Sequence, residues 1–137
     1  MESRYLYRGK RIDNREWVEG FLFMVNDVPY ILPHHKTGQP IHADNLLKTV
    51  VEVLEDTICQ CTELKDKNGK LIWENDILSG NIDVEFPEDE TRKRVVWHEN
   101  GWCTNEPGCD DYEELDDFDS ENFEVIGNKF DNPELLE

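Results

Sequence analysis

The chain has 137 residues, which is enough for one domain or for two small ones that share a lean core. Its formal net charge of −18 argues against direct binding to nucleic acid, because a polyphosphate needs matching cations on the protein. No apolar run is long enough to span a membrane and the first residues form no signal-peptide core, so we expect a cytoplasmic protein without membrane contact.

The first 60 residues predict a β region built on one hairpin. Residues 17–25 give a strong strand signal, because β-branched and aromatic side chains dominate them. Gly20 lies inside this run and predicts a bulge or the close approach of another backbone. A tight turn then leads into a returning strand at residues 28–32.

A loop, a short helix and another strand are expected between this hairpin and residue 60. Proline, histidine and glycine at 33–45 indicate the loop, and residues 46–48 predict a single helical turn. The β-branched residues at 49–54 predict the strand. We expect no long amphipathic helix in this half.

Residues 60–78 predict a turn, a short strand, a second turn and another strand. Gly69 can take a positive φ without steric cost, and Asp66 can accept hydrogen bonds from nearby amides. Asn75 is the residue of the second turn that we expect in the left-handed region. Such a sequence is typical of the start of a small, sharply curved β-barrel.

Spaced polar, aliphatic, glycine and aromatic residues fill this stretch; they are Gln60, Thr62, Leu64, Asp66, Gly69, Ile72, Trp73, Glu74, Asp76 and Ile77. Two blocks at 8–11 and 16–20 precede it. A closing block near the C-terminus includes Gly127, Asn128, Asn132 and Pro133. In this order the blocks resemble the YopX family of bacteriophage and prophage proteins, and the resemblance spans nearly the whole chain.

The resemblance implies an SH3-type barrel, a phage or prophage origin within a bacterial host, and no assigned activity. We therefore predict an all-β (mainly β) protein with an N-terminal β-hairpin region at residues 1–60 and a small SH3-type β-barrel at 61–137. Three positions depart from the family pattern, because Cys61 replaces an aromatic residue and Glu63 and Asn75 replace glycines. Asn75 tolerates a glycine-like backbone, whereas Glu63 does so less readily, so we expect a different local turn there.

The residues after the central stretch predict the remaining strands. Alternation of apolar and charged residues at 82–86 indicates a strand with one buried face. A return strand is expected at 92–97, a hairpin turn at 99–101 and a closing strand at 123–130. An acidic loop at 105–119 interrupts them.

Negative charge is concentrated in residues 61–137, which hold 23 Asp and Glu against seven Lys and Arg. Ten of these acids lie between Glu106 and Glu124. We expect a solvated loop there; the alternative is a Ca²⁺ site, although the EF-hand spacing is absent. The N-terminal region holds a cluster of basic residues, which are Arg4, Arg8, Lys10, Arg11 and Arg15. We expect this cluster to be a solvated face, with a nucleic-acid patch as the alternative.

Cysteines and histidines are the candidates for a metal site. Cys59 and Cys61 form a C-x-C pair, while Cys103 and Cys109 lie near His98 in the sequence, so a zinc site is one interpretation. The spacing is not that of a zinc ribbon, and we expect buried, inert thiols without a disulfide. Three loop histidines are expected at the surface rather than on a metal; they are His34, His35 and His42.

No nucleophile-elbow, phosphate-loop or zinc-protease motif occurs, so we expect neither an enzyme nor a cofactor. We expect a phage accessory protein that binds another protein, or a second copy of itself, through loops and edge strands. The alternative is a DNA mimic whose acidic half occupies a host DNA-binding protein. Trp73, Trp97 and Trp102 are expected in the barrel core, with a binding groove as the alternative.

Overall fold

The structure, a computed structural model, describes residues 5–34, 49–81, 85–86 and 89–137. The chain divides into two compact units, Met1–Cys61 and Thr62–Glu137. Antiparallel strands dominate both units, so the predicted all-β class is confirmed. The helical turn expected at 46–48 and most of the strand expected at 82–86 lie outside the described residues.

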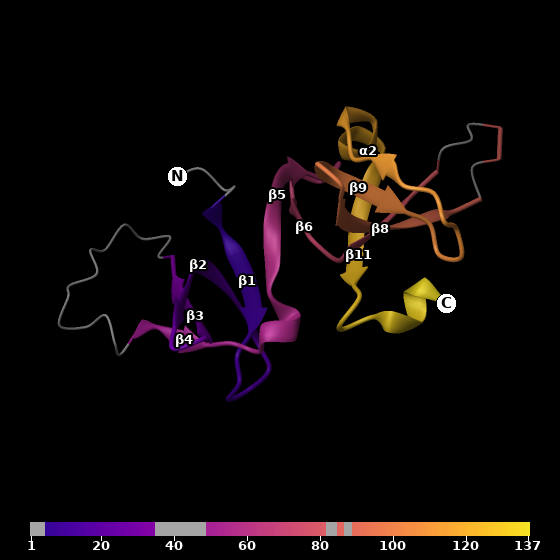
Figure 1. Cartoon of the computed structure of the whole chain (residues 1–137). Helices are drawn as coiled ribbons and strands as arrows, with labels where there is room; N and C mark the ends of the chain where they lie inside the picture. The colour runs from indigo at the N-terminus through magenta and orange to yellow at the C-terminus, as the bar shows by residue number, and fades with distance from the viewer. Residues whose placement is uncertain (1–4, 35–48, 82–84, 87–88) are drawn as a thin grey trace. The chain divides into compact units, whose positions relative to one another are not determined.

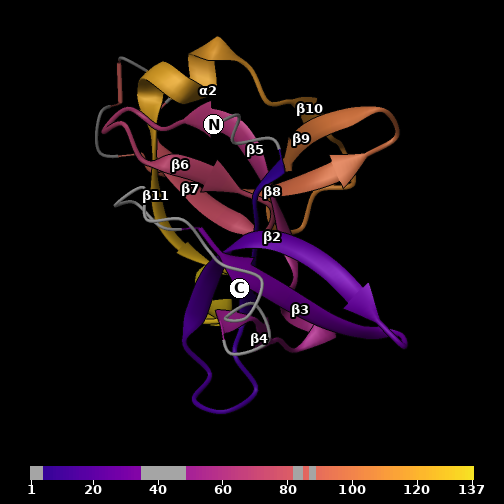
Figure 2. The same ribbon diagram turned by 90° about the vertical axis from the view of Figure 1, so that its left-hand side faces the viewer.

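The first unit is an antiparallel sheet around a long hairpin (Figure 2). Its elements are β1 (Tyr7–Lys10), β2 (Trp17–Val25), β3 (Val28–Pro33), β4 (Val51–Glu52), the 3-10 helix η3 (Glu55–Thr57) and β5 (Cys59–Lys65), whose last residues belong to the second unit. Asn26 and Asp27 join β2 to β3 with φ values of 51° and 65°. Two successive positive φ angles are what a tight two-residue hairpin turn requires.

Gly20 lies where the backbone of β3 comes closest to β2. A Cβ atom at this position would collide with the carbonyl group of Leu32. The pairing of β2 with β3 runs without a break from Val25 to Gly20, so the close approach is confirmed and no bulge interrupts this pair.

The second unit contains a five-stranded antiparallel sheet in the order β10-β9-β8-β7-β11 (Figure 2). Figure 1 labels β8, β9 and β11 of this sheet. Its elements are β6 (Leu71–Trp73), β7 (Asp76–Gly80), β8 (Thr91–His98), β9 (Gly101–Asn105), β10 (Glu113–Glu114), α2 (Asp117–Asn122), β11 (Phe123–Asn128) and the 3-10 helix η4 (Pro133–Leu136). β6 continues the other sheet, whose order is β4-β3-β2-β1-β5-β6. No helix among the described residues is long and apolar enough to cross a membrane.

The prediction of an SH3-type barrel is corrected in one respect, because the described strands of the second unit do not close into a ring. β10 and β11 are the two edges of the sheet, and β10 is only two residues long. The turn after β5 also occupies the free side of β11: the amide of Lys67 donates to the carbonyl of Phe123 at 3.0 Å. An edge that is already bonded to a turn cannot pair with a further strand at the same place.

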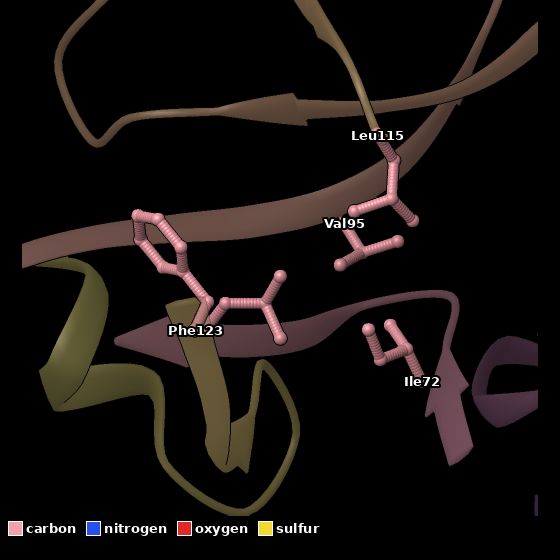
Figure 3. Close-up of a cluster of buried hydrophobic side chains, with 5 residues drawn as sticks. Ile72, Val95, Leu115 and Phe123 are labelled. Carbon is pink, nitrogen blue, oxygen red and sulfur yellow. The ribbon is translucent and has the colours of Figure 1, made fainter. Parts of the chain in front are cut away.

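A small apolar core holds the second unit together. Ile72, Val95, Leu115 and Phe123 point toward one another from four different segments (Figure 3), and Leu78 completes the cluster. Each of these side chains is at most 6% exposed. The core therefore depends on bringing β6, β8, β11 and the segment between β10 and α2 to one point, which only the tertiary fold achieves.

The three tryptophans of this unit have different environments. Trp73 is 3% exposed and Trp102 packs against the core cluster, so the core position is confirmed for these two. Trp97 is 53% exposed, and its predicted core position is wrong. Alternation along β8 places Trp97 on the same face as Val95, but at the strand end next to the hairpin turn, beyond the reach of the core.

Candidate interaction surface

Asp66, from the central motif, fixes a tight turn. Its side chain is buried and accepts hydrogen bonds from the backbone N–H groups of Asn68, Lys70 and Val125, each at 2.9 Å. Burial raises the pKa of this carboxyl, but the three N–H groups outweigh burial and bring the pKa below its ordinary value. Asp66 is therefore held as a carboxylate by the fold itself.

Two further motif side chains connect neighbouring strands and turns. The Thr62 hydroxyl donates to the carbonyl of Ile72 at 2.7 Å and accepts from the amide of Leu64 at 3.2 Å. The amide of Trp73 donates to the buried Asp76 carboxylate at 2.7 Å. These contacts satisfy backbone groups that the short strands leave unpaired.

Both positions at which this chain replaces a family glycine have a left-handed backbone. Asn75 has φ 70°, as expected, and Glu63 has φ 74°. Glu63 thus adopts the conformation that a glycine takes freely, instead of forming the different turn that we expected. Replacing the family glycine with Glu63 therefore leaves the backbone strained at this exposed residue.

The closing block forms a second interlocked turn. Asn128 Oδ1 accepts from the amides of Phe130 (3.0 Å) and Asp131 (2.9 Å). Asn132 Oδ1 accepts from the amide of Asn128 at 3.2 Å, and it fills the space that a Cβ on Gly127 would need. The structure thus brings these motif residues together. The remaining motif positions lie in β5, the β6–β7 turn, β7 and η4; they are Gln60, Glu74, Ile77 and Pro133.

The four cysteines differ in how deeply they are buried. Cys59 and Cys61 are buried, as expected for the C-x-C pair, whereas Cys103 is partly exposed and Cys109 is exposed. Within the described ranges no group of three His, Cys, Asp or Glu residues is placed to hold a metal ion. His35 and His42 lie outside these ranges.

The acidic segment is more ordered than the solvated loop that we expected. Asp119 is 2% exposed and accepts from Lys93 Nζ at 2.9 Å, while Lys93 also lies 4.6 Å from the centre of the Phe123 ring. Asp116 caps α2, because its side chain accepts from the amides of Phe118 and Asp119. The predicted solvated loop is wrong for Asp119, which belongs to the buried structure.

Sequence reasoning missed the buried pair of Lys93 and Asp119. The two residues are 26 positions apart, so no local spacing indicates that they meet. The one available signal was the place of Lys93 in β8, where it shares a strand face with Val95 and faces Leu78 across the sheet. A lysine in a row of core positions indicates a buried acidic partner.

Aromatic side chains gather at the exposed end of the β8–β9 hairpin. Trp97 and Trp102 face each other across the two strands and meet edge to face, with ring centroids 5.0 Å apart. His98 stacks on Tyr112 with centroids 3.8 Å apart and an angle of 2° between the planes. We call these four residues the aromatic end.

A hollow of about 460 Å³ lies beside the aromatic end. Its lining residues include Leu64, His98, Glu99, Trp102, Tyr112, Glu114 and Leu115. Cys103 also lines this hollow. Burial raises the pKa of the Cys103 thiol, and the negative charges of Glu114 and Glu99 raise it further. The described part of the chain therefore presents a hollow that is lined by aromatic rings and by the carboxylates of Glu99 and Glu114.

Comparison with known proteins identifies relatives of the whole chain. The family described as YopX protein matches residues 6–137. The crystal structure of protein EF1440 from Enterococcus faecalis is similar, with 25% sequence identity, a TM-score of 0.53 and coverage of 96% of each chain. The curated proteins contain no match.

Proposed function

The chain belongs to the YopX protein family, and we propose that it is a phage- or prophage-encoded accessory protein that binds another protein and catalyses no reaction. The family match over residues 6–137 and the similar fold of the Enterococcus faecalis protein support this kind of protein. We place the protein in the bacterial cytoplasm.

The exposure of Trp97 is the observation that carries the proposal. A tryptophan that is 53% exposed leaves a large apolar surface in water, although its neighbour Trp102 packs on the core. Tryptophan and tyrosine are enriched among the residues that dominate protein–protein binding. Trp102, which contacts Trp97, and Tyr112 line the hollow, which supplies a concave surface that a partner side chain could fill.

Affinity capture with matched variants tests the proposal. The tagged full chain is used to capture proteins from an induced host, in parallel with Trp97→Ala and Met24→Ala, and the captured proteins are identified by mass spectrometry. Met24 is 51% exposed in the first unit and is the matched control. We expect a protein that wild type and Met24→Ala retain and Trp97→Ala loses. Loss in Met24→Ala alone would move the contact to the β2–β3 hairpin and contradict the proposal for the aromatic end.

A DNA mimic is the second candidate, because most acids between Glu106 and Glu124 are exposed, Asp119 and Glu124 being the exceptions. A mimic would compete with duplex DNA for the captured partner, and its affinity would fall steeply as salt rises. Binding at the aromatic end predicts retention of the partner in the presence of excess DNA. Competition with DNA therefore distinguishes the two candidates.

A further inference from the structure

We propose that the hollow beside the aromatic end binds a lysine or arginine side chain from a peptide segment of the partner. This inference rests on the proposed protein-binding function and adds the chemistry of the segment that is bound.

The residues that line the hollow suit both the methylene groups and the charged group of a lysine or arginine side chain. Leu64, Trp102 and Leu115 provide apolar surface, against which the methylene groups of a lysine or arginine can pack. Tyr112 and His98 contribute a stacked pair of rings, and Tyr112 is 44% exposed. A cation over the face of a tyrosine or tryptophan is attracted by the ring.

The wall that carries Tyr112 is fixed in place before any ligand binds. Asn105 Nδ2 donates to the carbonyls of Cys109 (2.8 Å) and Asp111 (2.9 Å), which folds the acidic segment back along β9. The pairing of β10 with β9 then follows directly after Tyr112. The amide of Leu115 donates to the carbonyl of Trp102 at 3.0 Å and completes this wall. A preformed wall lowers the entropy that is lost on binding.

The charges around the hollow favour a cation over an anion. Glu99 and Glu114 line it, and no Lys or Arg is among its described lining residues. Burial raises the pKa of the Cys103 thiol, which lines the same hollow, and the charges of Glu114 and Glu99 raise it further. An acidic or phosphorylated segment would be repelled, whereas a basic segment is attracted to the whole second unit, in which acids outnumber bases by 23 to seven.

A peptide titration tests the inference with the full chain. The probe is a blocked synthetic peptide of about eight residues that alternates lysine with leucine, and its partner peptide has glutamine in place of each lysine. The variant Glu99→Gln/Glu114→Gln removes two charges at the hollow. The control Asp117→Asn/Glu121→Gln removes two exposed charges in α2 and changes the net charge equally.

We expect the lysine peptide to bind and the glutamine peptide to bind at least threefold more weakly. We expect the hollow variant to weaken binding of the lysine peptide by roughly three- to tenfold, from two exposed ion pairs, and the α2 control by less than twofold. Tyr112→Leu should also weaken binding, with a near-ultraviolet circular dichroism spectrum that shows the fold retained.

Three outcomes would overturn the inference: equal weakening by the two double variants, equal binding of the two peptides, or no binding of the lysine peptide. Each of these leaves the protein-binding function intact if Trp97→Ala still abolishes capture of the partner. Capture that survives Trp97→Ala contradicts the aromatic end as the binding surface, and the absence of any captured protein contradicts the proposed function, so these failures are distinguishable from failure of the inference.

Discussion

Asp66 and Val125 are joined by a hydrogen bond of 2.9 Å that crosses 59 residues of sequence. The backbone N–H of Val125 donates to Oδ2 of Asp66, while Oδ1 of the same carboxylate accepts from Asn68 and Lys70. One buried side chain thus closes the turn before β6 and attaches β11 to it. The central and closing blocks of the family motif meet at this carboxylate.

Replacing Asp66 with asparagine should destabilise the second unit. An amide has one accepting oxygen, so at least one of the three backbone N–H groups loses its acceptor. The expected loss in the free energy of unfolding is about 1–3 kcal/mol for a buried polar group left without a partner. Urea denaturation followed by tryptophan fluorescence measures it. Asp110→Asn, at an exposed residue, is the control and should change stability by less than about 0.5 kcal/mol.

The stability conferred by Asp66 should depend on pH in a defined direction. Because the pKa of Asp66 is lowered in the folded chain, its contribution is complete above the unfolded-state pKa of about 3.9. The contribution is lost as the pH falls through the lower folded-state value. We expect a constant difference in unfolding free energy between wild type and Asp66→Asn from pH 7 to pH 5, and a smaller one below about pH 4. A difference that grows on acidification would contradict this assignment.

The local sequence was sufficient to predict the structure at turns, where the backbone conformation depends on the residue type. Gly69 and Asn75 have φ values of 83° and 70°, because their residue types tolerate the left-handed region that the two turns need. Sequence reasoning failed where burial depends on distant partners. Asp119 is buried because Lys93 reaches it, and Trp97 is exposed because the core ends before the tip of β8. Neither outcome follows from neighbouring residues.

The strained backbone at Glu63 predicts a stabilising substitution. Left-handed backbone disfavours any residue with a Cβ, whereas glycine adopts it freely but loses more entropy on folding. Glu63→Gly should therefore raise the free energy of unfolding by about 0.5–1 kcal/mol relative to Glu63→Ala. The alanine variant is the right reference because it removes the same negative charge. Equal stability of the two variants in denaturant titrations would show that residue 63 is not strained.

Gly127 should not tolerate even an added methyl group. The Cβ of Gly127→Ala would displace the side chain of Asn132, which accepts from the amide of Asn128. We expect a loss of about 1–3 kcal/mol from overpacking and the broken turn. Gly101→Ala is the control, because no atom lies within 4 Å of its Cβ position. The double variant Gly127→Ala/Asn132→Gly should lose less than the sum of the single losses, as residues in contact do. Additive losses in thermal unfolding would exclude the contact.

The buried pair of Lys93 and Asp119 should be far more sensitive to loss of one member than to neutralisation of both. Their side chains are 8% and 3% exposed. Lys93→Met leaves the Asp119 carboxylate buried without its cation, which should cost about 3–5 kcal/mol. Adding Asp119→Asn removes the uncompensated charge, so the double variant should recover part of this loss. The recovery is partial because the Asp119 carboxylate also accepts from the amide of Asp116 in the cap of α2. Lys65→Met, at an exposed residue, is the control for loss of a lysine. Equilibrium unfolding of wild type, Lys93→Met, Asp119→Asn and the double variant gives the coupling energy of the pair. A Lys93→Met variant as stable as Lys65→Met would show that the ion pair contributes nothing to the fold.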